Sequence, residues 1–315
     1  MKIVVLDAYS LGEDLSLSPL AALGELTVYH NTSPEELSER IADADVTVQN
    51  KVRLTREALA SAKHLRLICE AATGYDNIDL DAARELGIAV CNVPGYSTPS
   101  VVQLTLSLVL SLATHLPEYT AHVADGSYSR GDAANRLVPV YHELCGKTWG
   151  IIGYGGIGRG VADVARALGC DVIYTRSTPD GDPACVTPDE LYRRADVITV
   201  HTPLTPETRG MIDTRALSLM KDGVILVNVA RGAVTDEVAI AEAVTSGKLG
   251  GFGCDVYSTE PFREDHPFFS LLGHPRVALT PHMAWGSFEA RTRCLATMVS
   301  NTEAFLRGER QNRIV

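Results

Sequence analysis

The segment that most constrains how this chain folds is a glycine-rich hexapeptide, Gly153-Tyr154-Gly155-Gly156-Ile157-Gly158. It follows an apolar run and precedes a helical pattern that extends to Leu168, so it predicts a strand, a tight turn and a helix. In such a unit Gly153 permits the turn, Gly155 lets the backbone approach a pyrophosphate, and Gly158 lets the helix pack against the strand. The free N–H groups of the helix start would face the phosphates. All six residues are therefore predicted to bind a dinucleotide.

Composition limits the classes of partner that the chain can have. Its 315 residues are enough for two domains with large cores. The net charge of -11, without any Lys/Arg-rich run, argues against binding to nucleic acid. The longest apolar stretch, Val101 to Ala113, contains polar residues and is too short to cross a bilayer, so no membrane partner is predicted.

The cysteines indicate the compartment. There are seven, scattered through the chain without a CxxC pair, and most lie in apolar runs. This pattern is typical of reduced core thiols and predicts a cytoplasmic protein. Residues 1–6 are too short for the apolar region of a signal peptide and are expected to form a first strand.

Short apolar runs alternate with helical patterns in two parts of the chain, which predicts parallel sheets covered on both faces. Between these parts we expect one long helix over residues 100–122 and an irregular stretch over 125–143. A last helix over 287–306 is expected to return to the first domain. The predicted fold is α/β, with two doubly wound parallel-sheet domains: a flavodoxin-like substrate domain and an inserted Rossmann dinucleotide-binding domain. Their predicted ranges are 1–98 plus 287–315, and 99–286.

The second strand of the dinucleotide unit bears on the choice of cofactor. An NAD site usually has a carboxylate at the end of this strand, which binds the ribose 2′-OH. Here the corresponding residues are Thr175 and Arg176, followed by Ser177, and they could hold a 2′-phosphate instead. We therefore favour NADP(H). NAD(H) stays open, because Asp180 and Asp182 follow closely and Arg176 could be a solvated side chain.

Three polar residues follow late strands, where open α/β sheets bind ligands. Arg231 has a fork of donors that can grip a carboxylate. His282 could protonate a developing alkoxide, and Glu260 could hold its ring and favour the imidazolium. Each residue alone has a structural explanation, as a surface charge, a cap or a core histidine. Together they form a constellation suited to reducing a keto acid, with hydride coming from a nicotinamide and no metal ion predicted.

With these motifs the chain resembles the D-isomer-specific 2-hydroxyacid dehydrogenase family over nearly its whole length. The resemblance rests also on the stretches 72–79, 201–205, 228–232 and 255–261. It implies that Arg231, Glu260 and His282 are the catalytic triad and that Asp255 bonds the nicotinamide carboxamide. The further cofactor-binding residues that it implies, besides His282 itself, are Thr105, His201, Thr202, Pro203, Val229 and Ala230. The implied substrate-binding residues are Lys51, Thr73, Gly74, Arg231, His282 and Trp285.

Within the family, several short stretches look like the glycerate dehydrogenase/hydroxypyruvate reductase branch. Trp285 beside the triad would narrow the pocket toward small 2-oxo acids, with hydroxypyruvate or glyoxylate the expected substrate and the D-hydroxy acid the product. Two alternatives stay open. One is a non-catalytic NAD(H)-sensing scaffold of the corepressor type, and the other is a 3-phosphoglycerate dehydrogenase, which would need extra cations such as Lys51 and Arg53. The resemblance also implies a homodimer with the helix over 100–122 in its interface.

Overall fold

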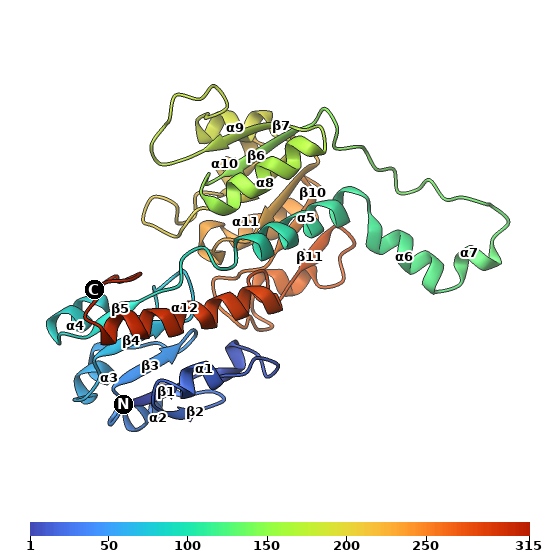
Figure 1. Cartoon of the computed structure of the whole chain (residues 1–315). Coiled ribbons are helices and arrows are strands. Elements are labelled where there is room, and N and C mark those ends of the chain that lie inside the picture. Colours follow the sequence, from blue (N-terminus) through green and yellow to red (C-terminus); the bar gives the residue numbers. More distant parts are fainter. The chain divides into compact units, whose positions relative to one another are not determined.

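The computed structural model describes all residues from 1 to 315 and divides the chain into two compact units (Figure 1). Unit 1 comprises Met1–Ser97 and Gly286–Val315, and unit 2 comprises Thr98–Trp285. Each boundary lies one residue before the one expected from the sequence. Unit 2 is thus an insertion in the chain of unit 1.

Unit 1 contains a five-stranded sheet in the order β2-β1-β3-β4-β5, and every neighbouring pair is parallel. This is the flavodoxin-like order that we predicted. The strands are β1 (Lys2–Val5), β2 (Glu25–Val28), β3 (Val46–Gln49), β4 (Leu67–Glu70) and β5 (Ala89–Cys91). The helices are η1 (Ala8–Ser10), α1 (Ser18–Ala21), α2 (Pro34–Ile41), α3 (Arg56–Ser61), α4 (Leu80–Glu85) and α12 (Phe288–Leu306).

Alternation along the strands of unit 1 separates two apolar faces. Ile68 packs with residues of α2, α3 and α4, including Leu59. Its neighbour Cys69 lies on the opposite face, where its sulfur is 3.4 Å from the hydroxyl of Thr302 in α12. The last helix therefore covers the second face of the first sheet, as the sequence predicts.

Unit 2 contains six parallel strands in the order β11-β10-β9-β8-β6-β7. They are β6 (Thr148–Ile152), β7 (Asp171–Thr175), β8 (Val197–Val200), β9 (Val224–Asn228), β10 (Leu249–Cys254) and β11 (Val277–Leu279). A single parallel bridge joins Tyr174 of β7, the edge strand, to Cys185. This bridge stands where the usual dinucleotide-binding order 3-2-1-4-5-6 has its third strand, an element that the sequence analysis did not predict.

Helices cover both faces of the second sheet (Figure 1). On one face α5 (Thr98–Ala113) and α8 (Gly156–Ala167) pack over Trp149 and Ile151. On the other, α9 (Pro188–Arg194), α10 (Thr214–Leu219) and α11 (Glu237–Thr245) pack over Ile152 and Ile198. Unit 2 also contains two short 3-10 helices, η2 (Gly232–Val234) and η3 (Pro267–Leu271). The observed architecture is the predicted doubly wound one.

The predicted long helix over 100–122 is wrong in its extent. The structure ends α5 at Ala113 and begins α6 (Leu116–Ala124) after a bend of 68°. His115 at the bend has a φ of 52°, and Pro117 has no N–H to donate to the preceding turn. No single helix is long and apolar enough to cross a membrane; α5 and α6 reach that threshold only as a bent pair, by length and composition.

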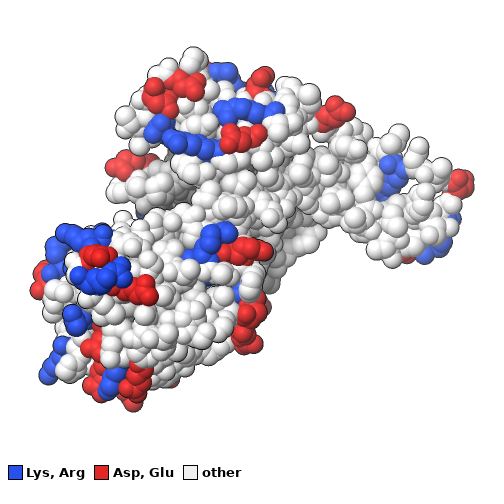
Figure 2. Space-filling model, in the orientation of Figure 1, with Lys and Arg blue, Asp and Glu red and all other residues white.

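Beyond the bend, residues 115–146 form an arm that carries α6 and α7 (Ser127–Arg130) and then runs without regular structure to β6 (Figure 1). Its surface in Figure 2 is mostly uncharged. On the faces of unit 1 and of the rest of unit 2 in that view, basic and acidic side chains are interspersed. All seven cysteines are free, and five of them are buried.

Candidate active site

Except for Thr105 in α5, the predicted cofactor and catalytic residues of unit 2 lie at or after the carboxyl ends of its strands. Because these strands are parallel, their carboxyl ends lie along one edge of the sheet. The glycine turn follows β6 and His201 follows β8, and these two strands are neighbours. The chain leaves β6 toward β7 on one side and reaches β8 on the other, so the turn lies at the point where the strand order reverses. Open sheets bind ligands at this point.

Three glycines of the turn differ in how much space surrounds them. Gly153 has a φ of 93°, and a Cβ there would lie 2.7 Å from the backbone of His201. A Cβ on Gly158 would lie 2.2 Å from the carbonyl oxygen of Gly153. Gly155, the N-cap of α8, is different, because a Cβ there would meet nothing within 4 Å. The backbone is thus open where a pyrophosphate would lie, and these residues fit a dinucleotide.

The end of β7 carries the residues expected to select the cofactor. Thr175 accepts a backbone hydrogen bond from Gly153, at 3.1 Å, and fixes the strand beside the turn. Arg176 Nη1 lies 2.7 Å from a carboxylate oxygen of Asp180, which also accepts a hydrogen bond from the hydroxyl of Tyr174. The bond to Arg176 is the main reason that the pKa of Asp180 falls to about 2. Ser177 is exposed.

The ring of Tyr174 stacks on Tyr154 of the hexapeptide at 3.6 Å between centroids. This contact joins the glycine turn to the strand that carries Arg176. Ile157 is partly buried against the core that α5 and α8 form with Trp149 and Ile151.

His201, Thr202 and Pro203 follow β8. The backbone N–H of His201 donates to Ile152 at 2.7 Å, which holds this segment against the glycine turn. Both ring nitrogens of His201 are buried without a hydrogen-bond partner, and burial lowers its pKa to about 3. The ring is therefore neutral and has one donor and one acceptor to offer. Thr105 lies buried in α5, where its hydroxyl donates to Val101 at 2.7 Å.

The side chain of Asn228, the last residue of β9, shapes the turn that leads to Arg231. Its amide donates to the carbonyl of Arg231 at 2.9 Å and accepts from the N–H of Ala230 at 3.0 Å. The side chain of Val229, the next residue, is buried. The sequence analysis gave no role to Asn228, although it lies in a stretch that carries the family resemblance.

Glu260 and His282 are in direct contact. A carboxylate oxygen of Glu260 lies 2.6 Å from His282 Nδ1, and the two side chains keep 30% and 24% of their exposure. The other carboxylate oxygen accepts from the N–H of Tyr257 at 3.0 Å. The second ring nitrogen of His282, Nε2, is on the far side of the imidazole from Glu260. The structure therefore brings together two of the three predicted catalytic residues.

Asp255 holds the turn that carries His282. Its buried carboxylate accepts the hydroxyl of Thr280 at 2.6 Å and the N–H groups of Met283 and Ala284 at 2.9 and 2.8 Å. Burial is the main reason that the pKa of Asp255 is raised. This role was not predicted; the sequence analysis gave Asp255 only a nicotinamide contact. Trp285 is partly buried against the core beneath α5 and α8.

The predicted substrate residues of unit 1 also follow strands. The hydroxyl of Thr73 donates to Val93 at 2.9 Å, and its carbonyl accepts from Asn92 at 2.8 Å, next to Gly74. The N–H of Lys51 donates to the carboxylate of Asp7 at 2.6 Å. Burial raises the pKa of Asp7 to about 6. The sequence analysis did not identify Asp7.

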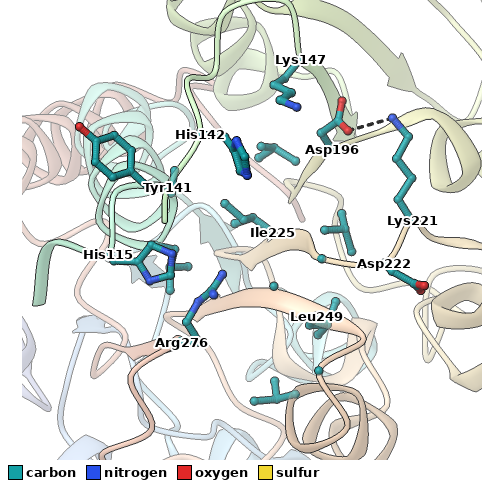
Figure 3. A pocket seen from close by; sticks show the side chains of 18 of the residues that line it. His115, Tyr141, His142, Lys147, Asp196, Lys221, Asp222, Ile225, Leu249 and Arg276 are labelled. Atoms are coloured by element: carbon teal, nitrogen blue, oxygen red, sulfur yellow. Dashed lines mark hydrogen bonds and ion pairs between the residues drawn. The ribbon is translucent and has the colours of Figure 1, made fainter. Parts of the chain in front are cut away.

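A pocket of about 740 Å³ lies elsewhere in unit 2 (Figure 3). It is lined by residues at the amino ends of the strands, such as Lys147, Ile225 and Arg276, and by His115 and Tyr141 of the arm. This is the sheet edge opposite to the glycine turn, so the pocket is not the predicted cofactor site. No group of three or more His, Cys, Asp or Glu side chains lies in an arrangement that could hold a metal ion.

Comparison with known proteins gives a family. The profile of the D-isomer specific 2-hydroxyacid dehydrogenase NAD binding domain matches residues 106–284, which lie within unit 2. The chain belongs to the D-isomer-specific 2-hydroxyacid dehydrogenase family. It is 40% identical to the hydroxypyruvate reductase of Blautia hydrogenotrophica over 99% of each chain. It is 36% identical to the glycerate dehydrogenase of Methylorubrum extorquens, over 99% of this chain and 98% of that one.

A solved structure has the same fold. An acyclic imino acid reductase in complex with NADPH and D-Arg superposes with a TM-score of 0.89, at 26% identity, over 100% of both chains. The family profile and the curated relatives confirm the predicted resemblance, and the solved structure agrees with the predicted two-domain α/β fold. As a D-2-hydroxyacid dehydrogenase, the chain is an oxidoreductase with a domain for NAD.

Proposed function

We propose that this dehydrogenase reduces a small 2-oxo acid of the hydroxypyruvate or glyoxylate type to the D-2-hydroxy acid. The observation that carries the proposal is the contact of 2.6 Å between Glu260 and His282 at the sheet edge that also carries the glycine turn. The names of the two curated relatives, a hydroxypyruvate reductase and a glycerate dehydrogenase, support the substrate class.

The proposed roles follow from the chemistry of each side chain. A nicotinamide supplies hydride when it is bound. His282 would donate a proton from Nε2 to the oxygen of the reacting carbonyl, since Glu260 occupies the side of Nδ1. The carboxylate of Glu260 would favour the imidazolium before the transfer and fix the plane of the ring. Arg231 would hold the substrate carboxylate and polarise its carbonyl with paired N–H donors.

Unit 1 would contribute substrate contacts in this proposal. The backbone N–H groups of Thr73 and Gly74 and the ammonium group of Lys51 are suited to a carboxylate. Trp285 of unit 2 would limit the length of the substrate. These assignments rest on the family resemblance and on the position of each residue directly after a strand.

We further propose that NADP(H) is preferred over NAD(H). No carboxylate is found at Thr175 or Arg176, where an NAD site usually has one, and Arg176 can offer its guanidinium to a 2′-phosphate. Asp180 holds that guanidinium at 2.7 Å, so a 2′-phosphate would have to compete with it. We expect Asp255 to bond the carboxamide of the nicotinamide, and Thr105 and His201 to Pro203 to line the same site.

The test is a side-by-side assay of NADPH and NADH oxidation with hydroxypyruvate, glyoxylate, pyruvate and 3-phosphohydroxypyruvate. The proposal expects turnover with hydroxypyruvate or glyoxylate and a higher kcat/KM with NADPH. Fast turnover with the phosphorylated acid alone would assign a phosphoglycerate dehydrogenase instead. Tight cofactor binding without turnover on any acid would favour the non-catalytic sensing scaffold.

We also propose a homodimer in which α5 and the arm form the interface. Several large apolar side chains of the arm are exposed: Leu116, Val123, Tyr128, Leu137, Val138, Val140 and Tyr141. Leu137 keeps 73% of its exposure, and Tyr141 borders the pocket of Figure 3. A clustered apolar surface of this kind marks a site of protein association. The seven free thiols support the further proposal that the enzyme works in the cytoplasm.

A further inference from the structure

Glu237, the first residue of α11, has a buried carboxylate for which the proposed mechanism has no use. Its side chain keeps 9% of its exposure. One oxygen accepts the N–H of Ser258 at 2.8 Å, and the other accepts the hydroxyl of Ser258 in a short hydrogen bond. His266 Nε2 lies 3.0 Å from this second oxygen, outside the alignment of a hydrogen bond, so the contact is electrostatic.

The orientation of His266 explains why its Nε2 faces the carboxylate. Its Nδ1 accepts the N–H of Phe268 at 3.1 Å and caps η3. A ring whose Nδ1 accepts carries its proton on Nε2, which is the ring nitrogen close to the carboxylate of Glu237. The ring lies against Phe262 at 4.9 Å between centroids. Glu237 therefore binds the loop of residues 257–266 near both of its ends.

The same loop carries Glu260. Ser258, which donates two hydrogen bonds to Glu237, is two positions before Glu260. The preceding residue, Tyr257, donates its N–H to one oxygen of Glu260, while the other oxygen meets His282. Displacement of Ser258 would move this N–H and turn the carboxylate of Glu260 away from the imidazole.

The loop also touches the segment of Arg231. A Cβ on Gly232 would lie 2.0 Å from the carbonyl carbon of Tyr257, so the two backbones are in direct contact. The segment of Arg231 and the loop of Glu260 thus pack against each other, and Glu237 of α11 binds this loop through Ser258.

We propose that Glu237 is a positioning residue, which acts through Ser258 to keep Glu260 against His282. It touches neither substrate nor cofactor in this proposal, which rests on the function proposed above. A buried carboxylate is costly to desolvate unless its hydrogen bonds are satisfied, and here they are satisfied by the loop that the acid must hold.

The test compares Glu237→Gln and Ser258→Ala with two matched variants. Glu237→Gln keeps the shape of the side chain but turns an amide N–H toward the N–H of His266. Ser258→Ala removes the hydroxyl and leaves Glu237 and the backbone N–H in place. Ser258→Thr restores a hydroxyl. The control is Glu242→Gln, an exposed residue on the same helix.

We expect Glu237→Gln to lower kcat for the 2-oxo acid by roughly 10-fold or more, because misplacement of a catalytic pair is costly. The fall in kcat at high pH should begin at lower pH than in the wild type, since the imidazolium of His282 would lose part of its support from Glu260. Ser258→Ala should show the same change more weakly, and Ser258→Thr should recover it. The dissociation constant of the reduced cofactor should stay within about twofold, because the glycine turn is not part of this loop.

Two outcomes would overturn the proposal. One is a wild-type kcat and pH profile in both Glu237→Gln and Ser258→Ala. The other is a loss of kcat without any displacement of the profile and accompanied by weaker cofactor binding, which would indicate general unfolding of unit 2. Failure of the proposed function is distinguishable, because the wild-type enzyme itself would then show no turnover.

Discussion

At the scale of single residues, His282 occupies a conformation that few residues other than glycine adopt, with a φ of 52°. Its N–H donates to Thr280 at 3.0 Å, and Asp255 binds the two N–H groups that follow it. The surrounding hydrogen bonds therefore impose this conformation on the backbone. Such strain is found where a side chain must point in one direction, which here is toward Glu260.

His282→Ala should lower kcat by about 10²–10⁴, as expected when a general acid is lost. The affinity for reduced cofactor should hardly change, because the glycine turn is untouched. Steady-state kinetics and fluorescence titration of the cofactor measure the two quantities. A suitable control is His274→Ala, whose ring is not part of the catalytic edge. Full turnover by His282→Ala would remove this residue from the mechanism.

Arg176 and Asp180 should control cofactor choice in opposite directions. Arg176→Ala should weaken NADPH binding by roughly tenfold and leave NADH binding nearly unchanged, because only NADPH has a 2′-phosphate. Asp180→Asn should strengthen NADPH binding, since it removes the anion that holds the guanidinium at 2.7 Å. Titration with both cofactors measures the ratio. Equal effects of Arg176→Ala on the two cofactors would show that Arg176 does not contact the 2′-phosphate.

Asp7 should make the stability of unit 1 depend on pH. Its pKa of about 6 in the folded chain is above the value of about 3.9 in an unfolded one. The folded state therefore binds the proton more tightly, and this contribution to stability is lost as pH rises from about 4 to about 6. Asp7→Asn cannot ionise, so its stability relative to the wild type should increase over this range, by on the order of 3 kcal/mol.

Urea unfolding at several pH values measures the difference in stability between Asp7→Asn and the wild type. The unfolding is monitored by a spectroscopic signal that comes from unit 1. The exposed Asp43→Asn serves as the control. A difference between Asp7→Asn and the wild type that stays constant from pH 4 to pH 7 would contradict the assignment.

The proposed catalytic residues could be identified as candidates in the sequence because they follow strands and belong to recognisable motifs. The roles of Asp255 in holding the turn of His282 and of Glu237 in holding Ser258 could not be predicted. Their hydrogen-bond partners Met283 and Ser258 lie 28 and 21 positions away along the chain. A carboxylate in a loop or at a helix start has many explanations until its partners are known. Burial decides among them, and burial depends on the tertiary fold.

At the scale of elements, two glycines of the turn are needed for different reasons: Gly158 for folding and Gly155 for access of the ligand to the backbone. Gly158→Ala should destabilise unit 2, because its Cβ would lie 2.2 Å from the oxygen of Gly153. Gly155→Ala should fold with an unchanged thermal midpoint, since its Cβ meets nothing within 4 Å, yet bind cofactor more weakly because the methyl group occupies the path to the backbone. Thermal melts without and with cofactor measure both effects. An unchanged cofactor affinity in Gly155→Ala would place the pyrophosphate elsewhere.

Two elements show where sequence patterns are insufficient. The apolar periodicity over 100–122 continues through the bend at His115, so periodicity alone predicts one helix. Pro117 was the available signal, because proline is favoured in the first turn of a new helix. The bridge at Cys185 gave no signal, since one residue is too short to show alternation.

At the scale of the whole molecule, the two units have nearly the same order of strands in their sheets. Both contain a parallel sheet covered by helices, and in both most of the proposed site residues follow strands. The arm of residues 115–146 is the exception, because it leaves the layers and exposes apolar side chains instead of burying them. The sequence of the arm could not reveal that its apolar side chains are exposed, because single apolar residues are common in the surface loops of any protein.

The wild-type enzyme should have a mass near twice 33.9 kDa in light scattering at micromolar concentration. Leu137→Glu combined with Val140→Glu should yield a monomer, since a charge on each of these exposed side chains would have to be desolvated in an interface. Both side chains already face solvent in a single chain, so the substitutions should not impair folding of the monomer. The exposed Glu242→Gln should leave the dimer intact. A wild-type mass of 33.9 kDa would show that the arm is not a dimer interface.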